Sequence, residues 1–142
     1  MAIIQTLTTS FKVEVAQALH NFTTGTGNVF KLALYTANAD LGASTTAYTA
    51  SGEASGTNYT PGGITLTNIT PSFQGTTSYW SFQDVTFTNV TLTTNGALIY
   101  NSTNGNRSVA VLNFGVNITK TAQNLVITFP VNDATNAVLR IA

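Results

Sequence analysis

The fold class of this chain is decided by the stretch Gly96-Ala97-Leu98-Ile99-Tyr100-Asn101-Ser102-Thr103-Asn104-Gly105-Asn106-Arg107-Ser108-Val109-Ala110-Val111-Leu112-Asn113-Phe114. Two apolar runs, 96–100 and 108–114, flank a polar segment that contains Asn104-Gly105. Asn-Gly is a preferred pair for the tight turn of a hairpin, because both positions tolerate a positive φ. The stretch therefore predicts two antiparallel strands joined by a turn.

Similar apolar runs bounded by turn signals recur along the chain. In the run 29–35, Phe30, Leu32 and Leu34 share one face. The other predicted strands are 64–69, 79–87 with an extension through Val90 and Leu92, 125–129 closed by Pro130, and 137–141. Such spacing is typical of a sandwich or barrel. We expect a mainly β chain, residues 1–142 forming one antiparallel β-sandwich or jelly-roll-like barrel of about seven or eight strands.

One helix is predicted near the N-terminus, with Ser10 or Thr9 as its cap. Apolar residues follow at helical spacing, and they are Phe11, Val15, Leu19 and Phe22. Gly25 and Gly27 mark its end. A strand over residues 11–15 is the weaker alternative, because the next four residues prefer helix. Residues 1–10 are a candidate extended arm.

Charged residues make up only 7% of the chain, whereas about 25% is usual for soluble domains. The formal net charge is zero, and the five basic residues are scattered singly, so we expect no nucleic-acid or membrane partner. The chain has no cysteine, which excludes thiolate metal sites. So little charge removes the repulsion that keeps monomers apart, which favours a surface covered by partners.

Catalytic signatures are weak. His20 is the single histidine, and one histidine does not make a zinc site. The five carboxylates show no spacing that indicates an acid–base pair, and they are Glu14, Asp40, Glu53, Asp84 and Asp133. No serine lies in a nucleophile elbow, and no glycine-rich piece is a phosphate loop. We expect no enzyme, metal or cofactor.

Residues 37–60 form a long polar stretch, and loops of this length are usually functional or ordered by packing. We expect this loop and residues 1–10 to contact partners. The candidate loop-shaping or contact residues are Tyr48, Glu53, Gly56, Tyr59, Gly62 and Gly63. The glycines permit sharp turns. Tyr59 can pin the loop to the sheet, and Glu53 can accept backbone N–H bonds or remain a solvated carboxylate.

The chain resembles small virion structural proteins encoded among the head and neck genes of tailed bacteriophages. The likeness rests on Thr46-Ala47-Tyr48-Thr49 and on Glu53-Ala54-Ser55-Gly56-Thr57-Asn58-Tyr59-Thr60-Pro61-Gly62-Gly63, together with the runs 31–36, 96–101 and 106–115. These motifs are structural rather than catalytic. The resemblance implies a virion component, and its first interpretation is a capsid decoration (cement) protein that stabilises the assembled major capsid shell.

Such a protein is expected to be a homodimer or homotrimer whose partner is the major capsid protein or another virion protein. Because Met1-Ala-Ile-Ile-Gln-Thr has no basic or long apolar segment, we expect no signal peptide. Assembly in the host cytoplasm and release in the virion by lysis would fit. The alternative is a neck, tail or fibre-associated adaptor, or a host-glycan-binding protein that uses Tyr48 or Tyr59.

Overall fold

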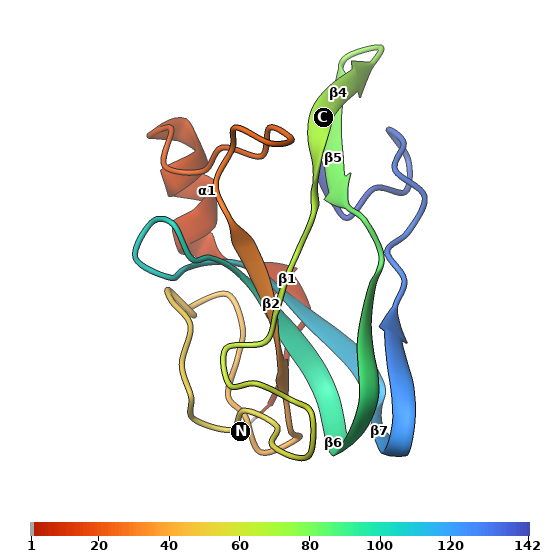
Figure 1. Ribbon diagram of the computed structural model, residues 1–142. Helices are drawn as coiled ribbons and strands as arrows, with labels where there is room; N and C mark the ends of the chain where they lie inside the picture. The colour runs from red at the N-terminus through yellow and green to blue at the C-terminus, as the bar shows by residue number, and fades with distance from the viewer. Residues whose placement is uncertain (1) are drawn as a thin grey trace.

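The computed structural model describes residues 2–142, which form two antiparallel sheets and one short helix (Figure 1). The larger sheet has the strand order β1 (Thr6–Leu7), β7 (Arg107–Ile127), β6 (Val85–Asn101), β2 (Phe30–Tyr35) and β3 (Ile64–Thr65). The smaller sheet has the order β4 (Asn68–Gln74), β5 (Thr77–Phe82) and β8 (Leu139–Ile141). The mainly β prediction is confirmed, and the arrangement is consistent with a sandwich.

The predicted hairpin is confirmed, but it is longer than the sequence indicates. Strands β6 and β7 pair from Asn101↔Arg107 at the turn to Val85↔Ile127 at the open end. The separate strand predicted at 125–129 is wrong, because its first residues are the end of β7. The pairing of β6 with β7 contains register shifts, and Asn89 and Ala122, which both have a positive φ, lie beside two of them. These irregularities hid the continuity of β7 up to Ile127.

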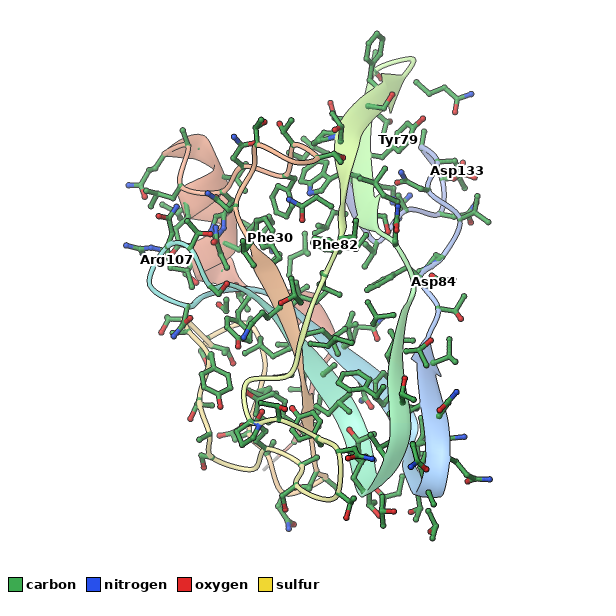
Figure 2. All side chains as sticks on the ribbon, viewed as in Figure 1. Phe30, Tyr79, Phe82, Asp84, Arg107 and Asp133 are labelled. Carbon is green, nitrogen blue, oxygen red and sulfur yellow. The ribbon has the colours of Figure 1, made fainter. Side chains whose placement is uncertain are left out.

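The predicted run 79–87 is divided between the two sheets. Strand β5 ends at Phe82 and β6 begins at Val85, so the chain changes sheets at Gln83-Asp84. The Asp84 carboxylate accepts the Phe129 N–H at 2.8 Å, which ties this corner to the chain that follows β7. Phe30 of β2 and Phe82 of β5 meet between the sheets, with ring centroids 5.7 Å apart (Figure 2).

The predicted helix is shorter than its apolar stripe. Helix α1 spans Thr9–Ala16 and follows Thr8, whose side chain makes no capping hydrogen bond. Ala18 has a φ of 59°, so the chain leaves the helix before Leu19. Phe22 nevertheless reaches the core from the following loop, where it stacks on Phe30. The apolar spacing therefore predicted the burial of Phe11 and Phe22 correctly, whereas Val15 and Leu19 are only partly buried, and it predicted the helix end wrongly.

The segment before α1 lies against the body of the protein and is not an extended arm. Ile3 forms a bridge with Leu41, and Thr6–Leu7 pairs with Ala110 and Val111 of β7. Thr8 is fully buried. Met1, the first residue of the candidate arm, lies outside the described residues.

The centre of the larger sheet is buried on both faces. One face carries Phe30, Leu32 and Leu34 into a core shared with the smaller sheet and α1, which confirms their predicted common face. The other face carries Ala33 and Tyr35 into a second cluster. Loop 37–60 contributes Ala39, Leu41 and Tyr48 to that cluster. The loop thus acts as a third layer, which explains why β2 is buried almost continuously.

Gly63 allows the chain that follows the loop to approach β2, and this gives a test of the packing. Gly63 has a φ of +83°, and an added Cβ would collide with the Leu32 carbonyl. We expect Gly63→Ala to lower the free energy of unfolding by about 2–5 kcal/mol, from backbone strain plus overpacking. Gly25→Ala is the matched control, since its φ is +79° and nothing lies within 4 Å of the added Cβ. Its cost should be only about 1–2 kcal/mol. Equal losses in urea unfolding would contradict this account.

Candidate functional site

The Glu53 cluster, defined here as Glu53 with Tyr48, Tyr59, Tyr100 and Gly62, joins the long loop to the sheet. Glu53 Oε2 accepts the Tyr48 hydroxyl at 2.6 Å. Glu53 Oε1 accepts the Tyr59 hydroxyl and the Gly62 N–H, both at 2.7 Å. Charge-assisted hydrogen bonds of this kind are among the strongest in proteins. One carboxylate therefore fixes three separate points of the chain.

The hydroxyl of Tyr59 extends this network to β2. It accepts the Leu34 N–H at 2.9 Å while it donates to Glu53. Tyr59 and Ala54 belong to the core between the sheets, whereas Tyr48 packs on the cluster at the other face. Glu53 thus stands where the loop passes from one face of the larger sheet to the other.

Two tyrosines on the sheet strands, which were not among the predicted site residues, complete the attachment. Tyr100 of β6 donates to the Gly62 carbonyl at 2.6 Å and stacks on Tyr48, with ring centroids 5.0 Å apart. Tyr35 of β2 donates to the Thr49 carbonyl at 2.6 Å. Both lie on strands predicted from apolar patterns, where a tyrosine counts as core and its hydroxyl is overlooked.

The tyrosines are held in the neutral form. Burial, with the hydrogen bond to Glu53 as the second cause, raises the pKa of Tyr48 to about 12. Burial is also the main cause that raises the pKa of Tyr59 and of Tyr35 well above the usual phenol value, and the negative charge of Glu53 adds to both shifts. The same two causes raise the pKa of Tyr100. The phenols therefore act as donors to Glu53 and to the loop backbone.

Five of the six predicted site residues lie together, since Tyr48, Tyr59 and Gly62 bond to Glu53 and Gly63 is next in the chain. The sixth, Gly56, supports the same loop. Gly63 follows Gly62 and passes close to Leu32. Gly56 approaches Thr91 of β6, where an added Cβ would meet the Thr91 carbonyl. Tyr59 is only 7% exposed, so its ring has no free face for a sugar. This burial overturns its predicted contact role and leaves a role in shaping the loop.

A second polar cluster holds α1 against the turn of the hairpin. Asn101 Oδ1 accepts the N–H groups of Thr103 at 3.1 Å and Asn104 at 3.2 Å, which orients its amide. Asn101 Nδ2 then faces His20 Nδ1 at 3.1 Å, so this ring nitrogen is the acceptor. His20 Nε2 carries the proton and donates to Glu14 Oε2 at 2.8 Å.

The titratable groups of this cluster bond to one another and to the turn. The His20 side chain has zero exposure and both of its ring nitrogens are engaged. The second oxygen of Glu14 accepts from Arg107 at 3.2 Å. The sequence did not reveal this contact between residues far apart in the chain. The predicted hairpin was a signal for part of this cluster, because the hairpin register pairs Asn101 with Arg107.

The remaining carboxylates are also structural or isolated. Asp133 accepts the N–H groups of Thr135 and Asn136, and the hydrogen bonds from Asn136 are the main cause that lowers its pKa. Asp40 is exposed. Among residues 2–142, no three His, Cys, Asp or Glu side chains gather in a way that holds a metal ion. No helix of the described chain is long and apolar enough to cross a membrane.

Comparisons with known proteins do not place the chain in a family. No protein-family model, curated protein or solved structure matches it.

The role of Glu53 is tested by Glu53→Gln, which keeps the shape and removes the charge. In this variant the side-chain NH₂ group would face a hydroxyl or N–H group that donates to the carboxylate in the wild type, so two donors would meet. We expect a loss of about 1–3 kcal/mol in the free energy of unfolding. Asp40→Asn is the matched control, because it removes one charge from an exposed position of the same loop. It should change stability by less than about 0.5 kcal/mol. Equal effects in urea titrations would show that Glu53 is an ordinary loop carboxylate.

The tyrosines predict a loss of stability in alkali. Their folded pKa values are raised above the unfolded value of about 10, so the folded state binds the phenol protons more tightly. Stability should be fully present below pH ~10 and should fall as pH rises from there toward 12. Each such phenol contributes a slope of up to about 1.4 kcal/mol per pH unit. Urea unfolding across this range measures the slope, and Tyr59→Phe should reduce it. An unchanged slope in that variant would contradict the assignment.

Proposed function

We propose that this protein is a non-catalytic structural subunit that assembles with other proteins, and in its specific form a decoration protein of a virus shell. The observation that carries the proposal is a surface with exposed apolar side chains and very little charge. Eight large hydrophobic residues are 46–74% exposed, and they are Ile4, Val13, Val29, Phe73, Val116, Val126, Val131 and Ile141. Only 7% of the chain is charged. Surfaces of this kind favour association.

The hairpin of β4 and β5 supports the proposal. It projects from the body of the molecule, beyond the rest of the sandwich (Figure 1). Phe73, near its tip, is 74% exposed, which is unusual for an aromatic residue of a free monomer. A projecting hairpin with an aromatic residue near its end is suited to insertion between neighbouring subunits.

The mechanism is linkage between binding and shell stability. A subunit that binds the assembled shell, and not the separate shell proteins, stabilises the shell by its binding free energy. Contacts made by apolar side chains and backbone groups depend little on salt, since few charges are there to be screened. The assignment to a virion rests on the sequence motifs in 31–63 and 96–115, and a homodimer or homotrimer is part of the same proposal.

Sedimentation with shells tests this function. Stripped shells of the tailed phage that encodes the chain should bind the purified protein saturably and should regain resistance to heat. Binding should change by less than about tenfold between 0.05 and 0.5 M salt.

Two variants sharpen the measurement. Phe73→Ser should weaken binding at least about tenfold, whereas Val126→Ser, an exposed apolar position on the larger sheet, serves as the control. No binding by the wild type, or full heat resistance of stripped shells, would refute the proposal.

A further inference from the structure

The turn of the β6–β7 hairpin contains one of the two Asn-Gly pairs in the chain. The pairs are Asn95-Gly96 and Asn104-Gly105. Asparagine is a thermolabile residue, and its side chain is attacked most readily by a following glycine, because that nitrogen has no Cβ beside it. Since the two pairs have the same sequence, a difference in their reactivity has to come from the structure around them.

The glycine of the turn has an open backbone. Gly105 is exposed, its φ is +64°, and nothing lies within 4 Å of an added Cβ. Its N–H donates to no residue among 2–142. Gly105 and Asn106, which also has a positive φ, are the central residues of a tight turn, closed by the Arg107 N–H donating to the Asn104 carbonyl at 3.3 Å. Solvent base therefore reaches the Gly105 N–H without any unfolding.

The glycine of the other pair is enclosed. Gly96 is buried in the larger sheet, where it lies between Tyr35 of β2 and Asn113 of β7. An added Cβ would collide with the Leu112 carbonyl. A backbone held on both sides cannot turn toward the preceding side chain unless the sheet opens. Asn95-Gly96 is thus an internal control for the pair in the turn.

The side chain of Asn104 has a structural role. Its Nδ2 donates to the carbonyl of Leu19, which lies just beyond α1, at 2.6 Å. Asn101 Nδ2 also approaches this carbonyl, but at 3.4 Å, which is long for a hydrogen bond. Asn104 therefore makes the shorter of the two bonds that hold the chain after α1 against the hairpin turn.

We propose that Asn104-Gly105 is a site of spontaneous deamidation and that the reaction releases the segment after α1 from the hairpin turn. Hydroxide removes the Gly105 N–H proton, and the nitrogen attacks Asn104 Cγ. The N–Cγ bond forms, the Cγ–Nδ2 bond breaks, and Nδ2 leaves as ammonia with a proton taken from water. Water then opens the cyclic imide at either of its carbonyls, which yields aspartate or isoaspartate.

Both products weaken the contact with Leu19. A carboxylate at position 104 has no N–H to donate, so its oxygen and the Leu19 carbonyl oxygen would be two acceptors facing each other. Isoaspartate also lengthens the main chain within the turn, which disturbs the pairing of Asn101 with Arg107. Either product adds a negative charge to a chain whose formal net charge is zero. This inference is independent of the proposed function.

Incubation of the folded protein at mildly alkaline pH tests the site. Mass spectrometry of fragments should find aspartate and isoaspartate forming at 104 at least about tenfold faster than at 95. In concentrated urea, where both pairs are exposed, the two rates should agree within about threefold. No reaction at 104 in the folded protein would show that the Leu19 bond protects the amide. Equal rates at 104 and 95 in the folded protein would show that the sequence alone decides. Either result would overturn the proposal.

Asn104→Asp tests the structural consequence. Leu19 and Asn21 have N–H groups that are hydrogen-bonded in the wild type, and their hydrogen exchange should become at least about tenfold faster in this variant. Asn106→Asp is the matched control, because it adds the same charge to the same turn. The side chain of Asn106 is exposed and bonds to no residue among 2–142.

The control should exchange these two protons at close to the wild-type rate. Equal acceleration in both variants would mean that the added charge acts without the Leu19 contact. Unchanged exchange in Asn104→Asp would mean that the amide does not hold the segment. Each of these outcomes would refute the proposed release, and the rates of deamidation in the wild type decide the site itself.

Discussion

The carboxylate of Glu53 is the constraint on which the architecture of this chain depends. It accepts hydrogen bonds from Tyr48, Tyr59 and Gly62, and through Tyr59 it is connected to the backbone of β2. A loop as long as 37–60 has a large conformational entropy when it is free. The chain offsets this cost by gathering several strong bonds on one charge. The second face of the larger sheet is covered only because the loop is held there.

Because that face is covered, the strands of the larger sheet can carry apolar residues on both sides. A sheet with one face in water shows an alternation of apolar and polar residues, whereas β2 has the nearly continuous apolar pattern of a strand buried on both sides. Tyr35 and Tyr100 meet two needs at this face, which are apolar burial and hydrogen bonds to the loop backbone. Their rings bury apolar area, and their hydroxyls supply donors to loop carbonyls that would otherwise be unpaired.

Local signals in the sequence predicted most of the fold and part of the site. The turn at Asn104-Gly105 and the common face of Phe30, Leu32 and Leu34 depend on neighbouring residues, so they could be read directly. The end of α1 and the full length of β6 and β7 could not, because tertiary packing overrides propensity and bulges disguise register. Glu53 stood out as a rare charge in a polar loop. The contact of Glu14 with His20 and Arg107 is set by the folded topology, and no local pattern announces it.

Most carboxylates of this chain serve the fold. Glu14, Glu53, Asp84 and Asp133 each accept hydrogen bonds from the protein itself, which leaves Asp40 as the carboxylate with no bond among the described residues. Four of the five carboxylates are thus engaged in contacts within the protein. Exposed apolar side chains are the other feature of the surface, and among the large ones Phe73 of β4 is the most exposed. The few charged contacts of this chain therefore serve the fold itself, at Glu53 and at the contact of Glu14 with His20 and Arg107.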